Sequence, residues 1–285
     1  VGAAWLFIEW FAGNETEEAI YGAAGGTLGT GAGVVAGLLF MVFVFVVNRK
    51  EIQRRIDNDY TVEVESYKEI FRTILMMVTP VIFSTCIYNL SSYLDQSFFA
   101  PLMMTNGWKA DDITIQYGIF SGQYMVMINI PIALANAAST AVLPSVSGNF
   151  AVGDVEGARH KINEAIQMTM FLCIPAAVGM CVLADPIMHL LFPSTTALAG
   201  KLLMAGAVSV IFYSLSTITN GVLQGIGKPS LPVRHAALSL VINVAVLAVL
   251  TKFTPLGIYS VMIATIAYSL AMCILNGRSV TKHLD

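Results

Sequence analysis

Stretches without a single charged side chain make up most of the chain, and short segments between them hold the charges. These stretches are residues 19–48, 73–94, 113–153, 165–184, 202–227 and 253–277. A helix needs about 20 mostly apolar residues to cross the hydrocarbon core of a membrane, and the stretches reach that length. A helix of a soluble protein is rarely uncharged all round for so long, because one face meets water. The pattern therefore predicts membrane-spanning helices.

The uncharged stretches and their hydrophobic flanks give seven predicted transmembrane helices. Their ranges are 20–47, 71–94, 114–142, 166–184, 201–224, 236–252 and 257–276. Composition agrees, since 56% of the residues are hydrophobic and only 12% are charged, about half the charged share of a typical soluble protein. We therefore predict an all-α integral membrane protein with about seven transmembrane helices.

The basic residues of the connecting segments fall almost entirely on one side of these helices. Twelve of the fifteen Lys and Arg residues lie on that side, in segments 48–72, 145–165, 225–235 and 277–285. Short cytoplasmic loops carry the excess of Lys and Arg in membrane proteins. We expect a multi-pass protein of the bacterial cytoplasmic (inner) membrane. The alternation predicts that the N-terminal end of this chain lies outside and its C-terminal end in the cytoplasm.

Charge and cysteine usage narrow the partners. The net charge is −3 and no basic tract is present, so we expect no nucleic-acid partner. All four cysteines fall inside apolar stretches without C-x-x-C spacing, which favours packing and predicts no metal site and no cofactor. Residues 1–11 are typical of the tail of an earlier helix. Because the chain opens with Val1 in hydrophobic sequence, we expect its natural N-terminus to lie further upstream.

Two features of the first 70 residues concern packing. Gly25, Gly29, Gly33 and Gly37 recur every fourth position, which gives one helix face that another helix can approach closely. The segment that follows mixes six basic with six acidic residues between positions 48 and 72. It is compatible with a short interfacial or cytoplasmic helix and equally with a solvated connector.

Asp95 is the candidate functional residue with the clearest physical argument. It is an acid inside a hydrophobic segment, where insertion of a carboxylate costs at least about 2.5–3.5 kcal/mol. At helical spacing Tyr88 and Ser92 share its face, with Asn89 beside them. Such a stripe lines a substrate cavity, binds a coupling ion, or is a structural acid hydrogen-bonded to a neighbouring helix near the outer interface.

Other predicted helices carry polar stripes as well. Amides and hydroxyls in lipid must find partners, so the stripes face protein or water. Any single stripe is compatible with interhelical hydrogen bonds, whereas several together favour a hydrated cavity. The stripes are Tyr117, Ser121 and Tyr124; Asn129 and Asn136; and Tyr213, Thr217, Asn220 and Gln224.

Three prolines lie inside predicted helices, namely Pro80, Pro131 and Pro175. Proline removes a backbone hydrogen bond and kinks a helix, and transporters use broken helices where their halves move. We predict that these positions are hinges. Membrane helices also tolerate proline without such a role.

Signals of catalysis are weak. The four histidines lie in loops or at a helix entry, and no HExxH, GxSxG or P-loop motif occurs. We therefore expect no enzyme and no catalytic residues.

Several segments resemble one family of transporters. The run Asn136-Ala-Ala-Ser-Thr-Ala-Val-Leu-Pro144 with the later Gly153-Asp154 turn resembles a helix end in the MviN/MurJ-like and stage V sporulation protein B-like polysaccharide flippases. The segment from Ile174-Pro175 through Leu191-Phe192-Pro193 is similar to the next helix and outer loop of these flippases. The segment from Asn220 to Pro229 is similar to a turn that follows a later helix of the family. The segment around Leu94-Asp95 resembles a further helix of the same family. The matches extend over about residues 80–280.

The resemblance implies a fold with two six-helix lobes, to which two further helices are often added. This chain would cover about helices six to twelve of that fold. Residues 1–47 would be the tail of one helix and the last N-lobe helix, 48–70 the cytoplasmic connector, and 71–285 the C-lobe. The arginines that line the cavity of peptidoglycan-precursor flippases have no counterpart in this chain.

The resemblance also implies a function. We expect a transporter that flips a lipid-linked oligosaccharide or peptidoglycan precursor across the membrane by alternating access, with membrane lipids around it and a proton or sodium ion as possible coupling partner. The predicted cavity or coupling residues are Asp95, Asn89, Ser92, Tyr88, Tyr124, Asn220 and Gln224. The alternatives are a multidrug/cation antiporter of the same superfamily, a membrane-embedded glycosyl- or acyltransferase, and a non-transporting scaffold.

Overall fold

The computed structural model describes residues 2–11, 13–58, 66–192 and 195–284, and these residues form helices and connecting turns without a strand. The elements up to the chain's middle are α1 (Gly2–Phe11), α2 (Glu15–Asp57), α3 (Tyr67–Thr105), α4 (Ala110–Ile119), the π-helical turn η1 (Phe120–Tyr124) and α5 (Met125–Ala151). They are followed by α6 (Val155–Val182), α7 (Ala184–Leu191), α8 (Ala197–Gly206), α9 (Ser209–Gly225), α10 (Ser230–Phe253) and α11 (Tyr259–Leu284).

The expectation of an all-α membrane protein is confirmed. Among the described residues, five helices are long and apolar enough to cross a membrane, or six when the bent pair α8 and α9 counts as one span. The remaining predicted span, 71–94, lies within α3, a continuous helix of 39 residues. Side chains at several α3 positions, including Pro80 and Tyr88, lie outside the described part of the chain.

The chain divides into two compact units, Val1–Ser66 and Tyr67–Asp285. In the first unit α1 packs against α2, and Gly25 makes this approach possible. A methyl group at position 25 would lie 2.6 Å from the carbonyl oxygen of Ala3, and one at Gly29 would lie 3.4 Å from the Ala3 Cβ. The glycine stripe thus serves helix packing at these two positions.

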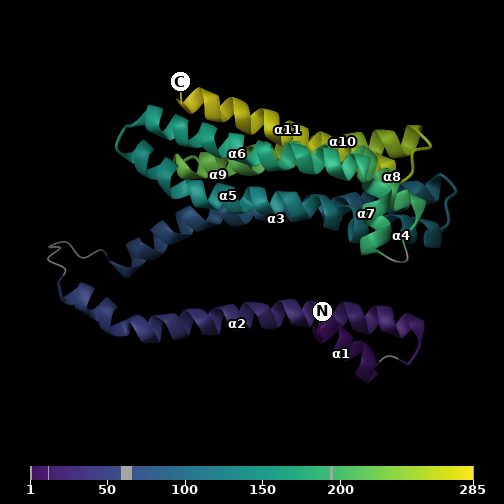
Figure 1. Cartoon of the computed structure of the whole chain (residues 1–285), viewed down its shortest axis with the longest axis horizontal. Helices are drawn as coiled ribbons and strands as arrows, with labels where there is room; N and C mark the ends of the chain where they lie inside the picture. The colour runs from purple at the N-terminus through teal and green to yellow at the C-terminus, as the bar shows by residue number, and fades with distance from the viewer. Residues whose placement is uncertain (1, 12, 59–65, 193–194, 285) are drawn as a thin grey trace. The chain divides into compact units, whose positions relative to one another are not determined.

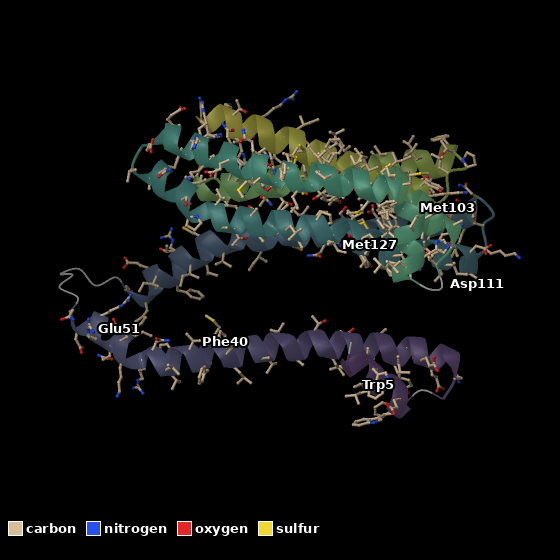
Figure 2. The ribbon with its side chains drawn as sticks, viewed as in Figure 1. Trp5, Phe40, Glu51, Met103, Asp111 and Met127 are labelled. Carbon is tan, nitrogen blue, oxygen red and sulfur yellow. The ribbon has the colours of Figure 1, made fainter. Side chains whose placement is uncertain are left out.

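The second unit is a bundle in which long helices lie side by side (Figure 1). α5 packs against α6 and α9, α11 against α9 and α10, and α10 against α3. The short helices α7 and α8 lie at the end of the bundle opposite the C-terminus (Figure 1). Side chains fill the space between helices, including buried Met103 and Met127, whereas Phe40 on α2 is exposed (Figure 2).

Turn chemistry separates the long helices. Gly153 has a φ of 79°, a left-handed conformation that glycine adopts without strain. The next residue, Asp154, caps α6 by accepting a hydrogen bond from the Gly157 amide at 2.8 Å. Gly227, with a φ of 76°, likewise separates α9 from α10. These are the Gly-Asp and Gly-Lys-Pro turns that the sequence contains.

Most helix boundaries differ from those predicted, and three of the differences affect the connector, Asp95 and the cavity wall. α2 continues to Asp57, so the start of the predicted connector 48–70 is helical, and residues 59–65 lie outside the described residues. α3 continues to Thr105, which places Asp95 well inside a helix. The predicted helix 201–224 is divided into α8 and α9, bent by 51°. Ser209 Oγ donates to the Gly206 carbonyl at 2.7 Å there, so a side chain binds a carbonyl at the bend.

The helices α3, α5 and α6 run without interruption through Pro80, Pro131 and Pro175. Pro131 is buried in the bundle, whereas Pro175 is exposed. The sharp bend lies between α8 and α9 and not at a proline. A hinge role of the three prolines stays a prediction.

Candidate functional site

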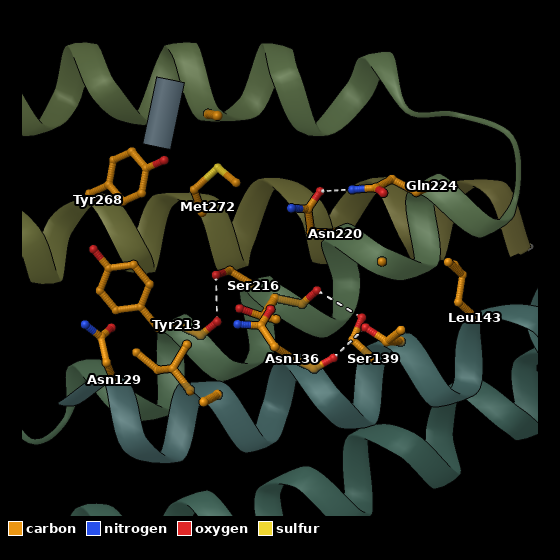
Figure 3. A pocket seen from close by; sticks show the side chains of 16 residues that line it. Asn129, Asn136, Ser139, Leu143, Tyr213, Ser216, Asn220, Gln224, Tyr268 and Met272 are labelled. Atoms are coloured by element: carbon orange, nitrogen blue, oxygen red, sulfur yellow. Dashed lines mark hydrogen bonds between the residues drawn. The ribbon is translucent and has the colours of Figure 1, made fainter. Parts of the chain in front are cut away.

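A cavity of about 560 Å³ opens between α5, α9 and α11 (Figure 3). Its volume falls in the range of about 300–1,000 Å³ that small-molecule sites occupy. All but one of the polar residues that line it come from α5 and α9. The polar residues that line it are Asn129, Asn136, Ser139, Thr140, Tyr213, Ser216, Thr217, Asn220, Gln224 and Tyr268.

Helical periodicity explains how α5 and α9 present these side chains. Asn129, Asn136 and Thr140 are seven and then four residues apart on α5, and therefore lie on one face. On α9, Tyr213, Asn220 and Gln224 follow the same spacing. Because the two helices pack against each other beside these faces, the two polar stripes meet at a common space.

Small residues hold α5 and α9 together at one side of the cavity. The Ser147 hydroxyl donates to the Gly225 carbonyl at 2.9 Å, and the Ser139 hydroxyl approaches the Thr217 carbonyl at 3.5 Å. A methyl group at Gly221 would overlap Ser139 Oγ. The close approach fixes the cavity wall in the way that small residues allow in membrane helices.

The side-chain amides differ in how they are held. Gln224 Nε2 donates to Asn220 Oδ1 at 3.3 Å, so these two amides orient each other (Figure 3). Asn129 and Asn136 are exposed, and within the described chain no side-chain hydrogen bond is found for them. Each of these amides offers two donors and an acceptor to a molecule in the cavity.

None of the described residues that line the cavity carries a charge. At one end lie Tyr213 and Tyr268, with ring centroids 6.3 Å apart, and Asn129; Asn220 and Gln224 lie toward the other end (Figure 3). The cavity is therefore electrically neutral, with polar groups set among apolar lining residues.

Asp95 occupies a different place, between α3 and α10. Only 5% of its surface is exposed, and its Oδ1 has no hydrogen-bond partner in the described chain. The Asn243 amide lies close enough to interact with the Asp95 carboxyl, although neither amide atom makes a hydrogen bond of good geometry. Ser239, one turn before Asn243, is also fully buried with its hydroxyl unpaired in the described chain. Unsatisfied polar groups at such depth are costly.

The predicted site residues therefore do not form one site. Asn220 and Gln224 line the cavity. Ser92 lines a second hollow of about 470 Å³ between α3 and α4, together with Tyr117 and Ser121. Asn89 is exposed on α3, and the side chain of Tyr88 lies outside the described residues.

Tyr124 is fully buried inside the bundle and is not part of either wall. Its hydroxyl donates to the Gly206 carbonyl at 3.2 Å and lies 3.3 Å from Ser209 Oγ. The structure thus places it beside the α8–α9 bend.

Ser239 and Asn243 were not among the residues selected from the sequence. A signal was present, since Asn243 is the one side-chain amide in the apolar stretch 236–252. An isolated amide has no stripe around it, and its position beside Asp95 depends on the packing of α10 against α3.

Comparisons with known proteins agree on fold and family. A family model for the lipid II flippase MurJ matches residues 4–284. The lipid II flippase MurJ of Bacillus subtilis is 29% identical over 188 residues, which are 65% of this chain and 34% of the relative. Stage V sporulation protein B of the same organism is 23% identical over 264 residues, 93% of this chain and 50% of the relative. The chain thus spans about a third to a half of the length of these relatives.

The fold is that of a known class of transporters. The crystal structure of a MATE in the bent conformation superposes with a TM-score of 0.72 over 99% of this chain and 59% of that chain, at 15% sequence identity. Together with the apolar helices, these matches show that the chain is a multi-pass membrane protein and belongs to the lipid II flippase MurJ family.

Proposed function

We propose that the protein flips a lipid-linked oligosaccharide or peptidoglycan precursor, a polyprenyl-diphosphate-sugar, across the cytoplasmic membrane by alternating access. The observation that supports this most directly is the polar cavity between α5, α9 and α11, inside helices that otherwise expose apolar side chains. A polar headgroup needs such a space to cross a membrane, whereas the polyprenyl tail can stay in lipid. The family match supports the same substrate class.

In this proposal the protein is a transporter and not an enzyme. Its site binds the substrate without making or breaking covalent bonds. Amides and hydroxyls hold the headgroup with comparable strength from either side, and rearrangement of the helices changes which side the site faces. With the C-terminal end of the chain in the cytoplasm, as the Lys and Arg distribution predicts, the Gln224 end of α9 faces the cytoplasm and the Tyr213 end faces outward.

Asp95 is the proposed coupling residue, binding a proton or a sodium ion. Its burial and the unpaired Oδ1 next to Asn243 support this role, because a charged carboxylate at that position needs a partner that neutralises it. The same carboxylate keeps the second candidate open, a multidrug/cation antiporter. Cation-driven drug efflux that Asp95→Asn abolishes would favour that candidate.

The test is translocation of the lipid-linked precursor in cells whose only flippase is the full-length protein. We expect precursor at the outer face with the wild type and a reduced amount with Gln224→Met or Asn220→Leu, which keep size and remove the amide. Absence of translocation with the wild type would contradict the proposed function, and drug efflux would then be measured.

A further inference from the structure

Resting on the proposed function, we infer that the cavity between α5, α9 and α11 binds the uncharged sugar part of the substrate, and that the diphosphate is held by other residues. The lining decides between the three chemical parts that all polyprenyl-diphosphate-sugars share, which are an apolar tail, an anionic diphosphate and a glycan. Each part requires lining residues of a different chemical kind.

The tail does not match the cavity. A polyprenyl chain carries no hydrogen-bonding group, so it would cover the amides of Asn129 and Asn136 without giving them partners. Apolar contact with lining residues such as Ile132, Leu143 and Met272 is opposed by this loss. The exposed apolar surfaces of the bundle, such as Phe171 and Val182 on α6, offer the tail a matching environment without this loss.

The diphosphate does not match it either. A bound diphosphate requires Lys, Arg or a metal ion, because an anion taken out of water without a counter-charge is strongly destabilised. None of the described lining residues is basic, and none is an acid that would hold a bridging cation. The lining residues that the structure describes therefore offer neither way of neutralising a diphosphate.

A sugar ring matches both the chemistry and the size. Its hydroxyl and acetamido groups each donate and accept, as do the side-chain amides of Asn136, Asn220 and Gln224. Apolar lining residues such as Ile132 and Met272 lie between the amides and suit the C–H faces of a ring. From Tyr213 to Gln224 the wall of α9 is about 16 Å long at the rise of an α-helix, which gives room for a short oligosaccharide.

The experiment uses the purified full-length protein in detergent and measures its affinity for two lipids that differ only in the sugar. One is a polyprenyl diphosphate without sugar, and the other is the same polyprenyl diphosphate carrying a disaccharide. The variants are Asn136→Leu, Asn220→Leu and Gln224→Met. The matched control is Gln167→Met, which removes an exposed amide on α6 outside the cavity.

We expect each cavity variant to bind the sugar-bearing lipid about five- to tenfold more weakly, the effect of one lost hydrogen bond, and the bare diphosphate lipid within twofold of wild type. The control changes neither affinity. Equal weakening for both lipids, or no weakening for either, would overturn the inference. If the wild type binds and flips the sugar-bearing lipid and the variants bind it equally well, the inference about the cavity fails but the proposed function stands.

A charged variant distinguishes the sugar from the diphosphate even if the amide deletions disturb local packing. Gln224→Glu keeps the shape of the side chain and places a carboxylate in the cavity. If the diphosphate bound there, repulsion would reduce affinity for the bare diphosphate lipid more than tenfold, and this would overturn the inference. We expect the charge to weaken only the sugar-bearing lipid, through the lost donor.

Discussion

The hydroxyl of Tyr124 lies directly against the backbone of Gly206. It donates to the Gly206 carbonyl at 3.2 Å, and a methyl group at position 206 would overlap the tyrosine ring and its hydroxyl. Ser209 donates to the same carbonyl at 2.7 Å. One contact thus joins the π-helical turn at the start of α5 to the bend between α8 and α9, and it is possible only because residue 206 has no side chain.

Gly206→Ala is expected to destabilise the protein by about 1–3 kcal/mol, because a buried tyrosine ring cannot move aside without disturbing the core. The measurement is thermal unfolding of the full-length protein in detergent. Gly148→Ala is the matched control, since a Cβ there meets no atom within 4 Å. We expect it to be neutral or slightly stabilising through helix propensity. Equal melting temperatures for the two variants would contradict the contact.

Gly221→Ala is expected to separate α5 from α9, because the new methyl group overlaps Ser139 Oγ. The second-site change Ser139→Ala removes that oxygen and leaves Ser139 Cβ as the nearest atom, at 3.5 Å, an ordinary contact distance. We therefore expect the double variant to recover most of the stability and of the translocation activity lost in the single variant. Failure of the rescue would show that the helices do not approach each other at this position.

Asp95→Asn is expected to leave folding intact and to abolish or strongly reduce precursor translocation. The amide removes a buried charge with an unpaired oxygen, so stability is expected to stay unchanged or to rise by about 1 kcal/mol. The two readouts are the melting temperature and the appearance of precursor at the outer face. Normal translocation by the variant would assign Asp95 a structural role.

His235 and Asn276 are expected to act as a pair. The ring Nδ1 lies 2.7 Å from Asn276 Oδ1, and Asn276 Nδ2 donates to the Ser216 carbonyl at 3.3 Å. The pair therefore ties α9, α10 and α11 together beside the cavity. A double-mutant cycle with His235→Ala and Asn276→Ala should give a coupling energy of about 0.5–1.5 kcal/mol. Strictly additive losses of stability would contradict the contact.

Much of the architecture could be read from the sequence because the bilayer imposes a one-dimensional rule. Helices that meet lipid must be apolar over a fixed length, so the charge-free stretches mark them without any tertiary information. The Gly153-Asp154 turn was also local, since a left-handed glycine and a capping aspartate act within four residues. The need for glycine at position 206 was not local, because a side chain there would overlap Tyr124, a residue of another helix.

For the candidate site, too, some features follow from the sequence and others only from the tertiary structure. The stripe of Tyr213, Thr217, Asn220 and Gln224 follows from helical periodicity alone, so the sequence determined which side chains share a face. Only the tertiary structure decided that this stripe meets Asn129 and Asn136 at one cavity while Asp95 lies apart, against Asn243. The physical reason is that periodicity fixes directions around one helix axis, whereas the partner of a face is set by how small residues such as Gly221 let two helices approach.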